Sequence, residues 1–173
     1  MAYHKAHEGV SRVVKIRHAH KAYLGIDLTP DAHDRLCHKY AGLVEQQVID
    51  CKSVDGALDF LKRATGLLKS FIVSGTPQDE LRRITAKRGI SEYFTGVYGS
   101  PRNKEDIVNE QLALHNLSAD RCLFIGDAMT DFNAAQACAM PFLGRVIKGE
   151  KSPFPKGTDE VTDLMGLAER AEI

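Results

Sequence analysis

The chain has 173 residues, of which 43% are hydrophobic, so it is long enough to bury one ordinary core with a small subdomain attached. Its 23 basic and 23 acidic residues cancel, which gives no reason to expect a nucleic-acid partner or an anionic membrane surface. No apolar stretch of signal-peptide type follows the first residues, and no apolar run approaches the length of a membrane span. We therefore expect a cytoplasmic protein.

The chain has four cysteines that show neither close pairing nor the spacing of metal ligands: Cys37, Cys51, Cys122 and Cys138. Cys122 and Cys138 lie among apolar residues, so we expect them to be small buried hydrophobic side chains. This use of cysteine fits a reducing compartment.

Residues from about 11 to 50 follow a helical pattern without a convincing buried strand. The run Thr29-Pro30-Asp31 predicts a helix start, with a hydroxyl cap, a proline in the first turn and a carboxylate near the positive helix end. Apolar residues then recur at three- and four-residue spacing and predict one buried face, formed by Leu36, Tyr40, Leu43, Val44 and Val48.

The same half carries four histidines, at His18, His20, His33 and His38. No pair of them has a ligand spacing supported by a nearby carboxylate or thiolate, so a metal site is the weaker interpretation. We expect them to be solvated or to cap helix ends.

From Val54 onward the pattern alternates between helices and strands. We predict helices at 54–65, 77–88, 103–115 and 130–138, and strands at 71–73, 97–98, 122–125 and 142–146. The strand at 142–146 is expected to be the last one, followed by a loop rich in Gly, Lys and Pro. Strands that alternate with helices predict a parallel sheet covered on both faces, which is a three-layer α/β fold.

Three polar motifs lie where a predicted strand ends or a helix begins. In the first, Ser74-Gly75-Thr76, glycine permits close approach of a ligand to the backbone, and the serine hydroxyl can donate to a phosphate oxygen. The alternative is an ordinary helix start, with Thr76 as the cap and Pro77 in the first turn.

The second motif is Lys104, which opens a predicted helix after Gly99-Ser100-Pro101-Arg102. A lysine in a first helical turn opposes the helix dipole, so its position needs a reason. Neutralising the charge of a bound phosphoryl group would supply one, and a solvated surface lysine is the alternative.

The third motif, the run from Gly126 to Asp131, is the strongest signal. Asp127 and Asp131 flank a tight strand-to-helix turn, and carboxylates at a strand end suit Mg²⁺, which bridges protein oxygens to a phosphate. The alternative is structural, with Asp127 capping the helix and Asp131 complementing its dipole.

In this order, the three motifs resemble those of the haloacid dehalogenase (HAD) superfamily of phosphohydrolases. The resemblance implies that Ser74, Gly75, Thr76 and Lys104 bind phosphate, with Lys104 also acting in catalysis, and that Asp127 and Asp131 bind Mg²⁺. It also implies a Rossmann-like core over residues 53–173 and a partial helical cap over residues 1–52. The implied substrate is a small phosphorylated metabolite, the chain is not expected to bind nucleic acid or membrane, and self-association is left open.

The family opens with an Asp-x-Asp signature that provides the nucleophile, and no Asp-x-Asp occurs in these 173 residues. The run from Gly25 to Thr29 has the outline of that signature around Asp27, but the residues before it are too polar for a central strand. We therefore expect a truncated or inactive form of a Mg²⁺-dependent phosphatase. The alternative is a complete but catalytically dead binding or interaction protein. A receiver-type signalling domain uses similar groups, but in another order.

The missing first strand would lie between the strands that end at Ser74 and Gly126. An open gap there would leave backbone groups unpaired, each costing about 1–3 kcal/mol if buried. We expect the two strands to close up, or the gap to be filled by the β-branched segment Val10–Ile16 or by a strand of a second copy.

Overall fold

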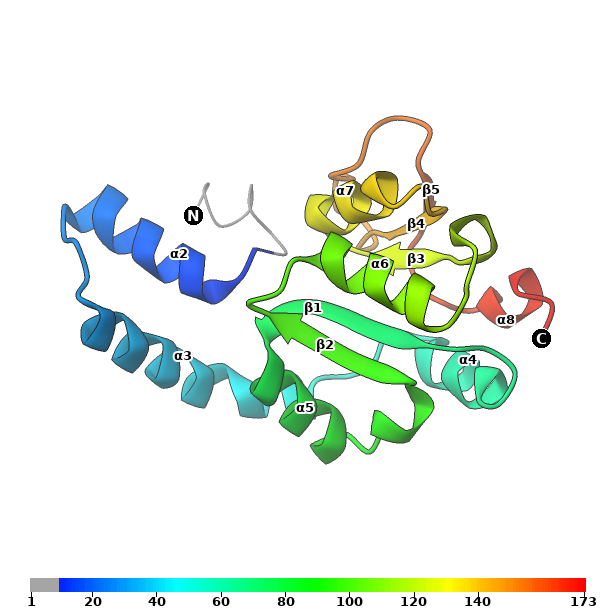
Figure 1. The fold of residues 1–173 in the computed structure, drawn as a ribbon, viewed down its shortest axis with the longest axis horizontal. Helices are drawn as coiled ribbons and strands as arrows, with labels where there is room; N and C mark the ends of the chain where they lie inside the picture. The colour runs from blue at the N-terminus through cyan, green and yellow to red at the C-terminus, as the bar shows by residue number, and fades with distance from the viewer. Residues whose placement is uncertain (1–9) are drawn as a thin grey trace.

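The computed structural model describes residues 10–173 (Figure 1), so the first part of the expected cap, residues 1–9, lies outside the described residues. The chain begins with three helical segments: α2 (Arg12–Ala19), the π-helix η1 (His20–Leu24) and α3 (Pro30–Asp50). In Figure 1, α2 and α3 run side by side as an arm that projects from the rest of the chain. We call these residues, 12–50, the helical arm.

Local sequence signals set the ends of the arm's helices. The Ser11 hydroxyl accepts a hydrogen bond from the Val13 N–H at 3.4 Å and begins α2, while Gly25, with φ of +68°, ends η1. The predicted helix start at Thr29-Pro30 is confirmed, because the Thr29 hydroxyl accepts the Ala32 N–H at 3.3 Å.

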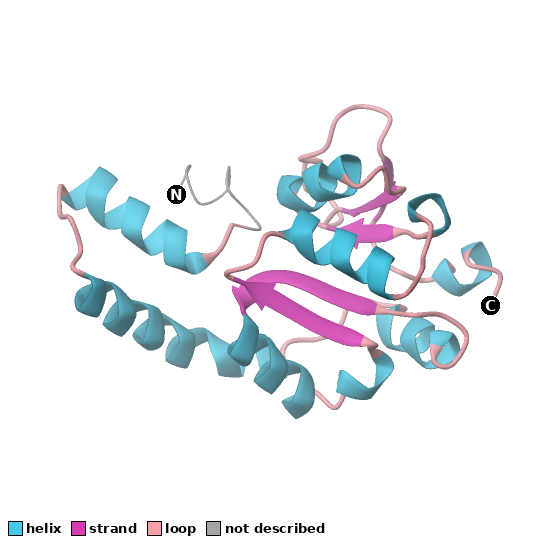
Figure 2. Cartoon of the chain, in the orientation of Figure 1, coloured by secondary structure: helices cyan, strands magenta, loops and turns pink. Residues whose placement is uncertain are grey.

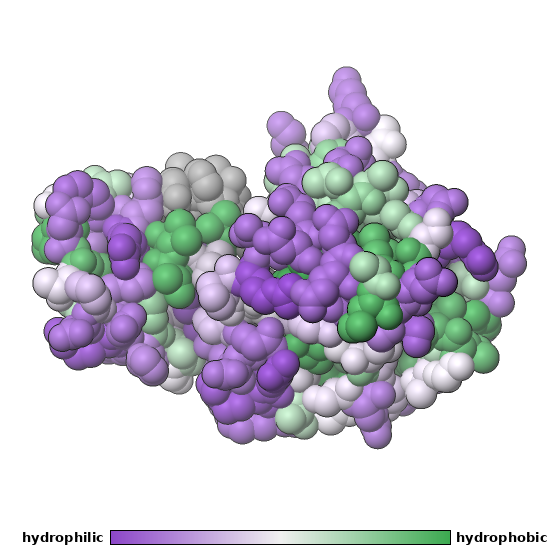
Figure 3. All heavy atoms as spheres, viewed as in Figure 1, coloured by the Kyte–Doolittle hydropathy of each residue, from purple (hydrophilic) through white to green (hydrophobic). Residues whose placement is uncertain are grey.

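Two expectations for the arm are wrong. The apolar face of α3 is not buried: Leu43 is 65% exposed and Val48 42% exposed, and hydrophobic surface remains visible on the arm in Figure 3. His33, expected to be solvated or capping, is the buried residue of α3, and its Nε2–H donates to the Val13 carbonyl at 2.7 Å. Leu36 and Val44 of the predicted face are half-buried, and the buried position of α3 is His33, whose ring contacts α2.

The remaining elements alternate between helix and strand, as the sequence predicted. In chain order they are α4 (Ala57–Ala64), β1 (Phe71–Pro77), α5 (Gln78–Lys87), the 3₁₀ turn η2 (Ser91–Tyr93), β2 (Gly96–Ser100), α6 (Lys104–Leu114), the 3₁₀ turn η3 (Ala119–Arg121), β3 (Phe124–Gly126), α7 (Met129–Ala137), β4 (Phe142–Arg145), β5 (Asp159–Val161) and α8 (Leu167–Arg170). The prediction that β4 is the last strand is wrong. The next strand, β5, reads Asp-Glu-Val and is largely exposed, so it lacks the apolar run that marks a buried strand.

The strands form two parallel sheets (Figure 2), one with the order β1-β2 and one with the order β3-β4-β5. Phe71 pairs with Gly96 at the start of the first sheet, and Phe124 pairs with Phe142 at the start of the second. In both sheets all strands run the same way, which confirms the expected parallel α/β architecture.

The gap between β1 and β3 is neither closed nor filled by the segment that we expected. Within residues 10–173, β1 pairs with β2 alone, and β3 pairs with β4 alone. Most of the segment Val10–Ile16 belongs to α2, so the prediction of a strand there is wrong. Arg12 and Lys15 explain this, because a central parallel strand would bury both charges while a surface helix leaves one face in water.

Helices α6 and α7 join the two sheets through one apolar cluster. Its buried part includes Val108 of α6, Ala134 and Ala135 of α7, and Phe124 of β3, and Val73 of β1 packs against it. The second sheet also carries edge-on aromatic contacts, with Phe142 at 5.4 Å from Phe132 and 5.2 Å from Phe154.

The expected role of two cysteines is confirmed. Cys138 is 7% exposed within the apolar cluster, and Cys122 packs against it. Burial raises the pKa of both thiols, so they stay protonated and act as small hydrophobic groups. All four cysteines are free thiols.

Candidate functional site

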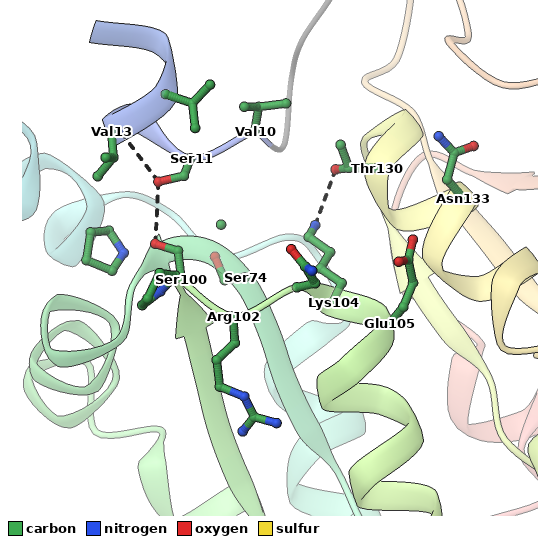
Figure 4. Close-up of a pocket in the computed structure, with 15 residues that line it drawn as sticks. Val10, Ser11, Val13, Ser74, Ser100, Arg102, Lys104, Glu105, Thr130 and Asn133 are labelled. Carbon is green, nitrogen blue, oxygen red and sulfur yellow. Dashed lines mark hydrogen bonds between the residues drawn. The ribbon is translucent and has the colours of Figure 1, made fainter. Parts of the chain in front are cut away.

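The three polar motifs lie at the carboxyl ends of β1 and β3 and at the starts of α6 and α7. Because parallel strands end at the same edge of their sheets, this is where α/β proteins place their ligands. A cavity of about 500 Å³ opens there (Figure 4). Its lining includes Ser74, Gly75, Lys104 and Thr130, so residues from all three predicted motifs meet at one cavity.

The Ser74 hydroxyl is held by its own turn. It accepts the Thr76 N–H at 3.1 Å and donates to the Thr76 hydroxyl oxygen at 3.2 Å. Thr76 thus orients Ser74 but does not line the cavity, whereas Gly75 does. The alternative in which Thr76 caps the next helix is wrong, because β1 continues through Pro77 and α5 begins at Gln78 without a side-chain cap.

Gln78 is a site-supporting residue that the sequence did not reveal. Its amide nitrogen donates to the Val97 carbonyl at 2.6 Å, and its amide oxygen accepts the Gly99 N–H at 2.8 Å. The Gln78 side chain therefore connects the start of α5 to β2 through two hydrogen bonds. Glycine is required at position 99, where an added Cβ would lie 2.3 Å from the Thr76 carbonyl oxygen. A glutamine after a proline carries no distinctive signal, so only the fold exposes this role.

Lys104 opens α6, as predicted, and its ammonium group pairs with Oδ1 of Asp131, 27 residues further along the chain. Their side chains are 14% and 9% exposed, and the Thr130 hydroxyl lies 3.4 Å from the Lys104 nitrogen. This pair explains why a lysine is tolerated at the positive end of a helix, since Asp131 compensates its charge.

Asp131 also organises the turn after β3. Its Oδ2 accepts the N–H of Ala128 at 3.1 Å and that of Asp127 at 3.3 Å, so both carboxylate oxygens have protein partners. Gly126 makes this possible, because a Cβ there would lie 2.3 Å from the Asp131 Cβ.

The Asp127 carboxylate is exposed and makes no hydrogen bond or ion pair to the described residues. Asp127 and Asp131 thus differ, one with free oxygens in solvent and the other bound to a lysine and two amides. No group of three or more potential ligands that could hold a metal ion occurs in residues 10–173. A metal ion here would have Asp127 as its available protein ligand and would keep several waters, as Mg²⁺ does.

Asp27 lies away from this site. It belongs to the connection between η1 and α3, where it pairs with Lys21 and is 78% exposed. Its place between two helices agrees with the interpretation that the run from Gly25 to Thr29 is not the relic of a nucleophile strand.

The parallel α/β core thus carries a hydroxyl, a lysine and two carboxylates at its strand ends and helix starts. The family model described as haloacid dehalogenase-like hydrolase matches residues 8–144. The chain belongs to this family, as the motifs indicated.

Solved structures share the fold at low sequence identity. A HAD hydrolase of family IA, variant 3, from Entamoeba histolytica aligns with a TM-score of 0.74 at 13% identity. The alignment covers 90% of this chain and 77% of the Entamoeba chain. The magnesium-bound HAD-hydrolase YfnB from Bacillus subtilis aligns at 0.72 with 19% identity and coverages of 95% and 74%. A predicted phosphoglycolate phosphatase from Haemophilus somnus aligns at 0.71 with 16% identity and coverages of 91% and 75%.

No curated protein matches the chain in sequence. Among the described residues, no helix combines the length and apolar character that crossing a membrane requires.

Proposed function

We propose that the site described above is the phosphate- and Mg²⁺-binding part of a hydrolase site for a small phosphomonoester. The observation that carries this proposal is the Lys104–Asp131 pair, which joins two distant motifs at the mouth of a cavity also lined by Ser74. A lone lysine or a lone acidic turn has an ordinary structural explanation. A buried lysine–carboxylate pair beside a free carboxylate and a hydroxyl is the arrangement that charge stabilisation of a phosphoryl group needs.

The residues have separate roles in this proposal. The Lys104 ammonium and the Ser74 hydroxyl bind the phosphoryl oxygens, and Gly75, which has no side chain, lets these oxygens approach the backbone closely. Asp131 keeps Lys104 extended toward the cavity and fixes the turn that presents Asp127. Thr76 sets the direction of the Ser74 hydroxyl.

The oxygen-only donor set fits Mg²⁺, and the free Asp127 carboxylate would be its main protein ligand. Bound there, the ion would neutralise phosphate charge. Asp131, with both oxygens engaged, would contribute through water or through Lys104. A Mg²⁺ titration by calorimetry tests this: Asp127→Asn is expected to weaken binding at least tenfold. Equal affinity in the two proteins would remove Asp127 from the metal site.

We further propose that the chain binds phosphate without turning it over. The Asp-x-Asp signature is absent from its sequence, and the two carboxylates at the site are assigned to Mg²⁺ and to Lys104. An assay of para-nitrophenyl phosphate with Mg²⁺ is expected to show no turnover above background, both for the wild type and for Asp27→Ala. Robust turnover that survives Asp27→Ala would reveal a nucleophile elsewhere in the chain.

Two further observations bear on the setting and the substrate of this site. The four free thiols favour a reducing, cytoplasmic setting. The neighbour from Haemophilus somnus is described as a phosphoglycolate phosphatase, which makes a carboxylated phosphomonoester one candidate substrate to test.

A further inference from the structure

The cavity has an apolar wall that the phosphate-binding residues do not explain. Val13 and Val14 line it from the first turn of α2, Val10 lines it from just before that helix, and Pro77 and Pro101 line it from the core. Val13 is 39% exposed and Val14 is 52% exposed, and both side chains line the cavity. In Figure 4, Val10 and Val13 lie across the cavity from Lys104 and Thr130. Single exposed valines are ordinary, but three that share one cavity form a surface that a ligand can cover.

Contacts on both sides hold this wall in place. The Ser11 hydroxyl lies 3.4 Å from the Ser100 hydroxyl, which joins the start of α2 to the loop after β2 (Figure 4). On the other side, the Arg12 guanidinium makes two hydrogen bonds to the Glu80 carboxylate of α5, at 2.6 and 2.9 Å. The side chains of Arg12 and Glu80 are 15% and 5% exposed, so a largely buried ion pair orients the helix that carries the valines.

The cavity offers little positive charge beyond what one phosphate needs. Of its described lining residues, the cationic ones are Lys104 and Arg102. Lys104 already pairs with Asp131, and the Arg102 guanidinium pairs with Glu110 and points away from the cavity (Figure 4). Glu105 lines the same cavity and adds a negative charge. A second anionic group on a ligand would therefore lose water without meeting a further cation among the described lining residues, which costs binding energy.

From the valine wall and this charge distribution, and resting on the proposed phosphatase site, we propose that the substrate's non-phosphate part is uncharged and apolar. Its phosphate lies between Ser74 and Lys104, and its apolar part packs against Val13 and Val14. These two valines are then specificity-determining residues. A carboxylated ester such as phosphoglycolate is disfavoured.

Calorimetry on the 173-residue chain with Mg²⁺ tests this with three probes: inorganic phosphate, phenyl phosphate and 2-phosphoglycolate. We expect phenyl phosphate to bind about tenfold more tightly than 2-phosphoglycolate, the scale on which small apolar groups are discriminated. The double variant Val13→Ser/Val14→Ser should lose this preference and keep its affinity for inorganic phosphate. Val48→Ser, an equally exposed valine on α3 outside the cavity, is the matched control and should keep the preference.

The outcomes separate the two proposals. If 2-phosphoglycolate binds as tightly as phenyl phosphate, or if the double variant keeps the preference, the assignment of the valine wall is overturned and the phosphate site stands. If inorganic phosphate does not bind, or binds equally well to Lys104→Ala, the proposed function is overturned and the substrate assignment falls with it. Both substituted valines are exposed, and equal melting curves will confirm that the double variant is folded.

Discussion

The Arg12–Glu80 pair is expected to be the strongest single link between the helical arm and the core. It joins α2 to α5 across 68 positions of sequence with two hydrogen bonds, and the Arg12 guanidinium also lies 5.0 Å from the centre of the Tyr40 ring on α3. The Arg12 side chain therefore links its own helix to two others, and its removal should loosen the packing of α3 as well as break the ion pair.

The burial of the Arg12 and Glu80 side chains sets the expected size of their coupling free energy. Two unit charges about 4 Å apart attract by about 4 kcal/mol at an effective dielectric constant of about 20, while exposed pairs contribute about 0.2–1 kcal/mol. Removing one partner of a fully buried pair costs about 3–5 kcal/mol. Because Arg12 keeps 15% of its exposure and Glu80 keeps 5%, we expect a coupling free energy of about 2–3 kcal/mol, within the range measured for close charge pairs.

A double-mutant cycle measures this coupling. Urea unfolding is followed for the wild type, Arg12→Met, Glu80→Gln and the double variant, where methionine keeps the apolar stem of arginine and glutamine keeps the shape of glutamate. The exposed pair Lys52–Asp55, with side chains 84% and 59% exposed at 2.9 Å, is the matched control and should give no more than about 1 kcal/mol. A coupling for Arg12–Glu80 no larger than that of the control would refute the reasoning from burial.

The remaining predictions concern the site turn, the arm and the open strand edges. Gly126→Ala places a Cβ 2.3 Å from the Asp131 Cβ and should destabilise the protein by about 1–3 kcal/mol and weaken Mg²⁺ binding. Gly42→Ala, with open space around it in α3, should instead be neutral or stabilising by about 0.5–1 kcal/mol in urea unfolding. A hydrogen bond from Arg83 lowers the pKa of Glu45, so its stabilising contribution is present above the unfolded value near 4.5 and is lost as the pH falls through the lower folded value. The gap in melting temperature between wild type and Glu45→Gln should therefore be present at pH 7 and shrink as the pH falls below about 4.5; a gap that is constant with pH would contradict this. Within residues 10–173, β1 and β3 each have an edge without a strand partner, which predicts self-association, so size-exclusion chromatography should show oligomers. A sharp, cooperative monomeric melting transition would contradict that prediction.

Much of the fold follows from local patterns. Thr29 and Pro30 begin α3 because a hydroxyl cap and a fixed φ act within one turn, and the apolar runs at β1 and β3 predict strands because parallel strands are buried on both faces. The positions of Ser74, Lys104 and Asp127 at strand ends and helix starts follow from the same patterns. These signals need only a few neighbouring residues, so the sequence by itself determined the family and the alternation of helices and strands as far as β4.

Other features depend on which surfaces meet, and only the tertiary structure decided them. The Asp131 carboxylate pairs with Lys104 and accepts two backbone N–H groups, because α6 and α7 bring residues 27 positions apart together. His33 is buried and Leu43 exposed because His33 faces α2, where its ring bonds to the Val13 carbonyl, and the periodicity of α3 does not reveal which side α2 covers. The short strand β5 is charged and forms through pairing with β4 rather than through burial of its own side chains. The free energies of burial and of strand pairing come from contacts between segments that are distant in sequence. A local sequence pattern therefore shows which polar and apolar groups are present, and the tertiary structure decides which of them come into contact.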